Sequence, residues 1–249
     1  MEKELYFITD LDRTLIHSKN KGYKCVESIG EKEITYMTEK SYNDFLSLLK
    51  IEYFKFIPCT MRNINQTLRI DFIREYNPKI VICSNGAQIY IDGKLDDFWE
   101  KEMRKIKSNE EVQEEITYIK SLNLAYKEVR NIEGFYVTIK CNSEEEAKAN
   151  SLKLVGKFGN KIKIIHIGIK IFIIDKRINK INAVDYIIKK YDIKKLFTAG
   201  DSEVDREFTK RGVSIIPKHS SFKHENSYIT EKEGIFSTED IINYLRKFC

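Results

Sequence analysis

The stretch LYFITDLDRT at residues 5–14 decides the fold of this chain. Its first half, LYFIT at 5–9, is a short apolar run rich in β-forming residues, and it ends abruptly in the polar DLDRT. Such a run is typical of a strand that is buried on both faces of a parallel sheet and leads into a loop. The sequence therefore predicts a buried strand that carries Asp10 and Asp12 to the carboxyl edge of a sheet.

Further strands and helices follow this strand in alternation. Apolar runs at 54–58 and 79–83 are preceded by stretches at 41–50 and 65–76 with helical spacing of apolar residues. This alternation predicts a parallel sheet covered by helices. The same rhythm returns after about residue 176, with expected helices at 182–191, 203–210 and 238–248 and expected strands at 195–200 and 213–217. The core sheet is thus expected to draw strands from both ends of the chain.

The intervening residues follow a different pattern. An Asp92-Gly93 turn between apolar runs predicts a hairpin, and a long charged stretch at about 99–122 predicts a helix. A strand at 134–142, a helix opened by a capping box at Ser143 and Glu146, and two strands that meet near Gly168 complete this part. We therefore predict an α/β fold with a Rossmann-like parallel-sheet core, residues 1–87 and 175–249, and an inserted α/β cap domain, residues 88–174.

Composition limits the possible partners and surroundings of the chain. With 42% hydrophobic residues among 249, the chain has enough apolar material to bury real cores. The net charge is +5, and the Lys and Arg residues are scattered along the chain without a recognisable nucleic-acid-binding motif. We therefore expect no nucleic-acid partner. The five cysteines show no metal-ligand spacing, and no apolar window approaches the roughly 18 residues of a membrane span. We expect a soluble, cytoplasmic protein that does not contact membranes.

Two pairs of carboxylates carry the candidate chemistry. Asp10 and Asp12 repel each other unless a cation neutralises them or one takes a proton. A lone Asp-x-Asp more often caps a helix or decorates a turn, but here Asp201 and Asp205 follow another apolar strand. Oxygen ligands from two neighbouring strand ends suit Mg²⁺, which we predict as the cofactor. Asp201 is the expected direct ligand, and Asp205, one helical turn further on, is expected to support it.

These residues and their order resemble the four motifs of the haloacid dehalogenase-like (HAD) hydrolase superfamily. The resemblance rests on DLDRT at 10–14, Thr60 after the second strand, a lysine before a helix, and GDSEVD at 200–205. SNGAQIYIDG at 84–93 and the inserted unit resemble the branch whose cap follows the third core strand. That branch includes Cof-like sugar-phosphate phosphatases, sucrose-phosphate phosphatase and phosphomannomutase. DLDRTLIHS, Trp99 and AGDSEVD also resemble phosphatase-like members encoded with tellurite-resistance genes.

The resemblance implies a role for each residue of the first motif. Asp10 would be the nucleophile that becomes an aspartyl phosphate. Asp12 would be the general acid and base, and its backbone carbonyl would also contact Mg²⁺. Thr14 would fix the loop on the substrate-binding side. Asp201 would complete the metal site with Asp10, and Asp205 would belong to the same metal-binding group.

The remaining implied roles fall on the other motifs. Thr60 would hydrogen-bond a phosphate oxygen, and Lys180 would neutralise charge on the nucleophile and the phosphoryl oxygens. Arg62 and Asn85 are candidate substrate-binding residues on neighbouring loops, although an arginine after a strand is as often a solvated surface residue. Ile181 stands where the branch often has glycine, which leaves Lys176 as a rival to Lys180.

Two further residues differ from the usual motifs of the superfamily: Met61 in the second motif and Val204 in the fourth. Both alter the surroundings of the site without removing a carboxylate. The predicted function is Mg²⁺-dependent hydrolysis of a small phosphorylated metabolite, a sugar phosphate among the candidates, through an aspartyl-phosphate intermediate. A phosphomutase of the same superfamily and a catalytically silent binding module are the alternatives. The motifs alone do not distinguish hydrolysis from transfer to a second hydroxyl.

Overall fold

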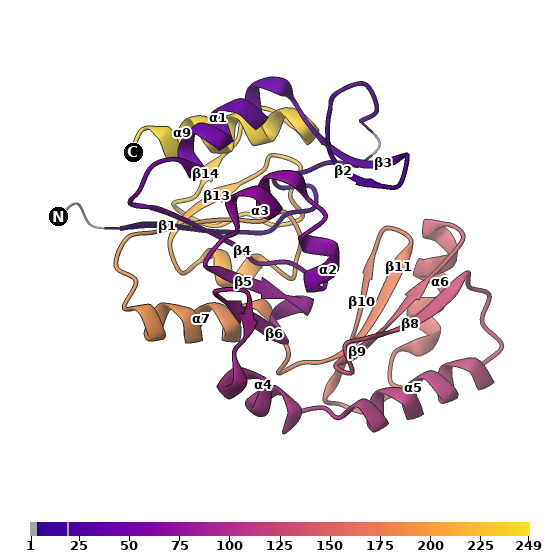
Figure 1. Cartoon of the computed structure of the whole chain (residues 1–249). Helices are drawn as coiled ribbons and strands as arrows, with labels where there is room; N and C mark the ends of the chain where they lie inside the picture. The colour runs from indigo at the N-terminus through magenta and orange to yellow at the C-terminus, as the bar shows by residue number, and fades with distance from the viewer. Residues whose placement is uncertain (1–3, 19) are drawn as a thin grey trace. The chain divides into compact units, whose positions relative to one another are not determined.

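The computed structural model describes residues 4–18 and 20–249 of the chain (Figure 1). It consists of two compact units, one formed by Met1–Asp96 and Lys180–Cys249 and the other by Asp97–Asn179. We call these the first and the second unit and describe each by itself. Compared with the expected insert at 88–174, the second unit begins later, at Asp97, and ends later, at Asn179. The role of the insert as a cap stays a prediction.

A five-stranded parallel sheet forms the centre of the first unit, in the order β14-β13-β12-β1-β4. The predicted α/β fold with a parallel core sheet is confirmed, and β1 lies between a strand from each end of the chain. All five residues of β1 are buried, as the apolar run predicted. The strands are β1 (Leu5–Thr9), β4 (Phe54–Pro58), β12 (Leu196–Ala199), β13 (Val213–Ile216) and β14 (Tyr228–Ile229).

Helices cover both faces of this sheet (Figure 1). Helices α1 (Glu39–Leu49) and α9 (Ser237–Arg246) pack against each other, and α7 (Lys180–Tyr191) packs against the short α8 (Arg206–Thr209). Aromatic side chains fill the layer beneath α1, where the ring of Phe45 lies 5.1 Å from that of Phe56 and meets it edge-on. Such contacts give the layer much of its buried apolar area, which stabilises the position of β1 and β4.

The segment between β1 and β5 contains two departures from the predicted elements. The helix expected at 65–76 is two short helices, α2 (Ile64–Thr67) and α3 (Asp71–Tyr76), and Asn63 begins the first with a capping box. A hairpin of β2 (Lys24–Ile29) and β3 (Lys32–Met37) was not predicted. Its register shifts around Glu27, and such a bulge interrupts the period-2 alternation by which a strand is recognised in sequence.

A small antiparallel sheet follows the third predicted strand. It contains β5 (Ile80–Cys83), β6 (Gln88–Ile91) and β7 (Lys94–Leu95), and β5 is joined to the end of β4 by a parallel bridge between Cys59 and Ile82. The predicted turn at Asp92-Gly93 is confirmed, since both residues have the positive φ that a tight hairpin turn requires. A single 3₁₀ turn, η1 (Ser84–Gly86), connects β5 to β6.

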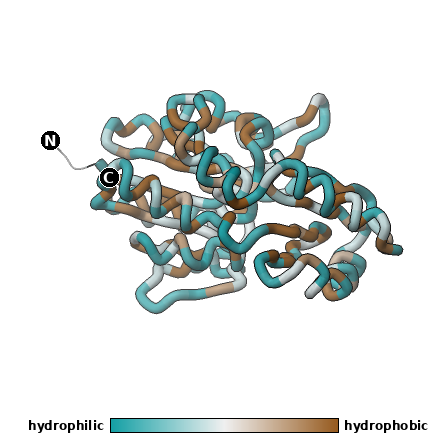
Figure 2. Tube along the Cα trace, turned by 90° about the horizontal axis from the view of Figure 1, so that it is seen from below, coloured by the Kyte–Doolittle hydropathy of each residue, from teal (hydrophilic) through white to brown (hydrophobic). Residues whose placement is uncertain are grey.

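The second unit is a four-stranded antiparallel sheet packed against helices. Its strands follow the order β10-β11-β9-β8, and α5 (Asn109–Ser121) and α6 (Glu144–Leu154) pack against them around apolar residues such as Ile119, Val137 and Ile171. The strands are β8 (Glu128–Ile132), β9 (Tyr136–Lys140), β10 (Ile162–Ile167) and β11 (Lys170–Asp175). Figure 2 shows hydrophilic and hydrophobic residues in alternation along the coiled segments of the whole chain, as expected where one helix face is buried.

The helices of the second unit show how local capping divides a charged stretch. The helix expected at 99–122 is two helices, α4 (Asp97–Arg104) and α5, because Ser108 and Glu111 form a capping box that starts a new helix. At α6 only half of the predicted capping box is present: Ser143 accepts from the backbone of Glu146, whose carboxylate accepts from Asn142 instead. Among the described residues, no helix has the length and hydropathy to cross a bilayer.

Candidate active site

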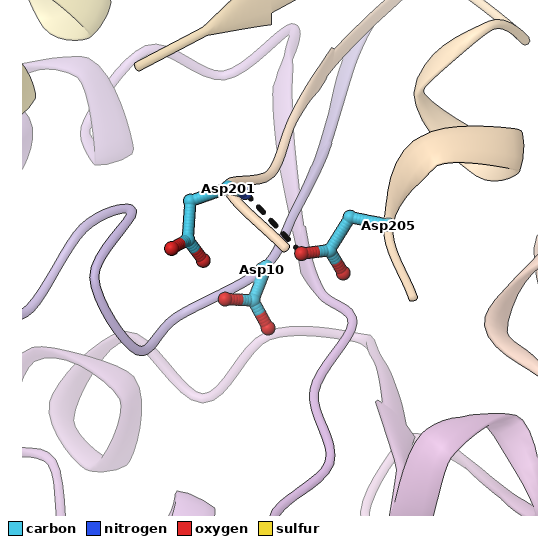
Figure 3. A group of neighbouring side chains, drawn as sticks. All are labelled: Asp10, Asp201 and Asp205. Atoms are coloured by element: carbon cyan, nitrogen blue, oxygen red, sulfur yellow. Dashed lines mark hydrogen bonds between the residues drawn. The ribbon is translucent and has the colours of Figure 1, made fainter. Parts of the chain in front are cut away.

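Asp10, Asp201 and Asp205 meet at the carboxyl edge of the parallel sheet and are called here the aspartate cluster (Figure 3). The backbone N–H of Asp10 donates to the carbonyl of Ala199 at 2.9 Å, so the ends of β1 and β12 are directly joined. One carboxylate oxygen from each residue lies within 4.8 Å of the others, and all three residues are buried. The expected approach of acids from the two ends of the chain is therefore present.

Asp205 shapes the loop that carries Asp201. Its Oδ2 accepts hydrogen bonds from the backbone N–H of Asp201 at 3.2 Å and of Ser202 at 3.0 Å, and from the Ser202 hydroxyl at 2.8 Å (Figure 3 draws the first). A Cβ on Gly200 would lie 2.4 Å from the Cβ of Asp205, so only glycine fits there without movement. Asp205 thus fixes the backbone from which Asp201 projects.

Lys180, the first residue of α7, is the buried cation that contacts Asp10 and Asp205. Its Nζ donates to Asp10 Oδ1 at 2.6 Å and to Asp205 Oδ1 at 2.7 Å, and its side chain is fully buried. The rival Lys176 is exposed and belongs to the second unit. Of the two candidates, Lys180 alone contacts the aspartate cluster in the described structure.

Charge in the cluster is out of balance. Burial raises the pKa of Asp10 above its ordinary range despite the opposing charge of Lys180, and burial together with Asp205 raises the pKa of Asp201 to about 7. For Lys180, burial favours the neutral amine, but the carboxylates of Asp10 and Asp205 outweigh it and raise the pKa of the ammonium. The three acids outnumber the two nearby cations, Lys180 and the exposed Arg13, so the site favours an additional positive charge.

The donor set fits a hard divalent cation. All three side chains offer carboxylate oxygens, the ligand type that Mg²⁺ prefers. The buried Oδ2 of Asp201 accepts no hydrogen bond from the described part of the chain, although Arg13 Nε lies 3.2 Å away as an ion-pair partner. A buried acceptor without a hydrogen bond lowers the stability of the folded state unless a further ligand binds to it.

Thr14, Thr60 and Asn85 lie in the loops next to the cluster. Thr14 donates to Asp10 Oδ2 at 3.4 Å, which links the start and the end of the first motif. Thr60 is buried after β4, and its carbonyl accepts from the backbone N–H of Asn85 at 3.0 Å. The loops after β4 and β5 are thus held together, while the contacts of these three side chains with a substrate stay predictions.

Arg62 forms a bidentate ion pair with Asp12. Its Nε and Nη2 each donate to one oxygen of Asp12 at 2.7 Å, and its Nη1 donates to Glu27 at 2.8 Å. Arg69 donates to the other oxygen of Glu27 at 3.0 Å, and Thr35 donates to Glu27 at 3.1 Å. We call Asp12, Glu27, Arg62 and Arg69 the hairpin cluster.

The hairpin cluster was not anticipated from the sequence. Glu27 is buried on β2, within the bulge that hides the strand pattern, and its arginine partners lie far from it along the chain. A buried glutamate with two arginines has no local spacing that reveals it. The carboxylate of Asp12 is absent from the aspartate cluster, so its expected contact with a metal through the backbone carbonyl stays a prediction, as does a phosphate contact of Arg62.

Comparison with solved structures agrees with this fold. A solved structure of sucrose-phosphatase from Synechocystis sp. PCC6803, in complex with sucrose and phosphate, is similar at TM-score 0.68 and 13% identity over 98% of both chains. A Thermotoga maritima protein gives TM-score 0.67 and 17% identity over 97% of both chains. A haloacid dehalogenase-like hydrolase from Bacteroides thetaiotaomicron gives 0.62 and 12% identity, over 99% of this chain and all of that one.

The chain is a phosphatase of the haloacid dehalogenase-like class. The model of the sucrose-6F-phosphate phosphohydrolase family matches residues 3–239, and the chain belongs to that family. The resemblance drawn from the four motifs is therefore confirmed at the level of superfamily and branch. No curated protein sequence matches the chain.

Proposed function

We propose that the chain hydrolyses a sugar phosphate with the help of Mg²⁺, through an aspartyl phosphate on Asp10. The observation that carries this proposal is the aspartate cluster, where three buried carboxylates from two ends of the chain meet and two of them, Asp10 and Asp205, bind Lys180. The substrate class rests on the family, which is named for a sugar-phosphate phosphohydrolase, and on a similar structure that holds sucrose and phosphate.

Asp10 and Asp201 would hold Mg²⁺ through their carboxylates, with the backbone carbonyl of Asp12 beside them and Asp205 as the residue that fixes Asp201. When bound, the ion would neutralise the acids and polarise a phosphoryl oxygen. This assignment is supported by the oxygen donor set and by the buried Oδ2 of Asp201, which accepts no hydrogen bond from the described residues.

In the first half of the reaction, a carboxylate oxygen of Asp10 attacks phosphorus and the bond from phosphorus to the ester oxygen breaks. Asp12 donates its proton to the leaving oxygen, so that the sugar leaves as an alcohol. Lys180 fixes the Asp10 carboxylate and offsets negative charge near the phosphoryl group. Arg62 donates hydrogen bonds to both oxygens of Asp12 in the described structure, so at least one of these bonds has to break for the proton transfer.

In the second half, a water molecule attacks the phosphorus of the aspartyl phosphate. Asp12, now a carboxylate, takes a proton from that water, and the acyl phosphate bond breaks to release inorganic phosphate and the Asp10 carboxylate. The bidentate contact with Arg62 favours the carboxylate form that this step needs. Asp12 thus alternates between the two protonation states within one catalytic cycle.

A phosphate-release assay with a panel of sugar phosphates, sucrose 6-phosphate among them, tests the proposal. We expect release of inorganic phosphate from at least one sugar phosphate with MgCl₂ and none with EDTA. Asp185→Asn, which changes a surface carboxylate paired with Arg211, is the matched control and should keep the activity. Formation of an isomeric sugar phosphate without free phosphate would support the mutase alternative, and no reaction across the panel would refute the proposal.

A further inference from the structure

Arg13 occupies an unusual position in the first motif, directly beside the aspartate cluster. Its backbone has φ of 65°, in the left-handed region that residues with a Cβ seldom adopt. Two hydrogen bonds hold this conformation: its N–H donates to the carbonyl of Ile16 at 2.7 Å, and Nε2 of His219 lies 2.8 Å from its carbonyl oxygen. The direction in which the side chain leaves the backbone is therefore fixed by the fold.

The guanidinium of Arg13 is the counter-ion of Asp201. Its Nε lies 3.2 Å from Asp201 Oδ2, the same buried oxygen that accepts no hydrogen bond from the described residues. Lys180, by contrast, bonds to the other two acids of the cluster, Asp10 and Asp205. Arg13 thus supplies positive charge at the oxygen that the proposed function assigns to Mg²⁺.

The two partners of this ion pair differ in their freedom to move. The side chain of Arg13 is 56% exposed, whereas that of Asp201 is 3% exposed and anchored in the loop that Asp205 shapes. An exposed arginine can rotate into solvent at small cost because a surface ion pair contributes little free energy. A divalent cation that binds Asp201 can therefore displace the guanidinium.

We infer that Arg13 competes with Mg²⁺ for Asp201 and so weakens the affinity of the site for the ion. This inference rests on the proposed metal site but not on the identity of the substrate. Removing the charge should tighten Mg²⁺ binding, both because the competing partner is lost and because repulsion between two cations falls. From the usual strength of an exposed ion pair, the dissociation constant should fall by about two- to fivefold.

Calorimetric titration of the metal-free protein with MgCl₂ tests the inference without any substrate. Arg13→Gln should bind Mg²⁺ about two- to fivefold more tightly than the wild type, and Arg13→Lys, which keeps a charge, should lie between them. Arg211→Gln is the matched control, because it removes the same charge from another arginine–aspartate pair, Arg211 with Asp185. It should bind Mg²⁺ as the wild type does.

Melting curves give a second readout that also reports folding. Metal-free Arg13→Gln should melt at a slightly lower temperature than the wild type, and MgCl₂ should raise its melting temperature by more, because the ion binds more tightly. If Arg13→Gln binds Mg²⁺ no more tightly than the wild type, while Asp201→Asn loses the ion, the role of Arg13 is wrong and the metal site stands. If the wild type and Asp201→Asn both fail to bind Mg²⁺, the metal site and the inference fall together.

Discussion

The aspartate cluster and the hairpin cluster are two charged groups in the same unit, each with at least one buried acid, and they differ in how their charge is compensated. In the hairpin cluster, two carboxylates face two guanidinium groups, and each oxygen of Glu27 accepts at least one hydrogen bond. In the aspartate cluster, Lys180 contacts two of the three carboxylates, Asp10 and Asp205, and the third, Asp201, forms an ion pair with the exposed Arg13. Removing one partner of a balanced group leaves a buried charge without compensation and destabilises the fold, whereas an unbalanced group favours binding of a cation.

The largest expected effect comes from the nucleophile of the unbalanced cluster. Asp10→Asn keeps the shape of the side chain but removes the attacking carboxylate, so we expect turnover to fall by at least about 10³-fold. Phosphate release at saturating Mg²⁺ measures this loss. Melting of the metal-free variant should occur near or above the wild-type temperature, because one buried negative charge is gone. Activity of Asp10→Asn at the wild-type level would exclude Asp10 as the nucleophile.

The next largest effect should come from breaking the balanced cluster. Glu27→Ala leaves Arg62 and Arg69 without their shared buried partner, and we expect the free energy of unfolding to fall by about 3 kcal/mol. Urea denaturation of the metal-free protein measures it. Glu31→Ala, at an exposed position of the same hairpin, is the control and should change stability by less than about 0.5 kcal/mol. Equal stability of the two variants would mean that the hairpin cluster is not a structural element.

Gly200 and Gly212 offer a matched pair that separates metal binding from stability. A Cβ at Gly200 would lie 2.4 Å from the Cβ of Asp205, and one at Gly212 would lie 2.4 Å from the carbonyl oxygen of Leu196. Both alanine variants should lose about 2 kcal/mol of stability through overpacking. Only Gly200→Ala should also weaken Mg²⁺ binding in calorimetry, because it displaces the loop of Asp201. A loss of affinity in Gly212→Ala of the same size would contradict this distinction.

The smallest expected effect concerns His17, a buried neutral neighbour of the first motif. Burial, with smaller contributions from His219 and Arg13, lowers its pKa to about 3 from an ordinary 6.5. The unfolded chain therefore binds a proton that the folded chain resists, so the stability contributed above pH 6.5 is lost as the pH falls toward 3. Between pH 7.5 and pH 5.5, the wild type should lose about 1 kcal/mol that His17→Gln does not lose.

Urea denaturation of the two proteins at several pH values measures this difference. Above pH 7, where histidine is neutral in both states, the stability curves of the wild type and His17→Gln should run parallel. The hydrogen bond of 2.9 Å between His17 and Thr238 places the ring in the interior of the first unit. Parallel curves down to pH 5 would show that the folded protein accommodates a charged His17.

The sequence predicted those parts of the molecule that rest on local patterns. The apolar runs that became β1 and β12 are each followed within two residues by an aspartate, and the sheet edge brings these aspartates, Asp10 and Asp201, together. The hairpin of β2 and β3 was missed because its bulge breaks the alternation of side chains. The charged stretch at 99–122 was predicted as one helix because its composition is uniform, whereas the cap at Ser108 that divides it depends on a single hydroxyl.

The site residues show the same limit. Lys180 was preferred over Lys176 from the motif, and the contact of Lys180 with Asp10 supports that choice. Glu27, Arg69 and the ion pair of Arg13 were not foreseen, because each depends on residues that meet only after folding. Their partners are charged side chains separated by tens of residues or more, and no periodicity marks such pairs.

The most direct test of the account is a crystal structure of the protein with Mg²⁺ and beryllium fluoride, a mimic of the phosphoryl group on a carboxylate. We predict one Mg²⁺ bound by oxygens of both Asp10 and Asp201 at about 2.1 Å, with beryllium on Asp10 and Lys180 beside it. A cation bound elsewhere, or Asp10 and Asp201 too far apart to share it, would contradict the account.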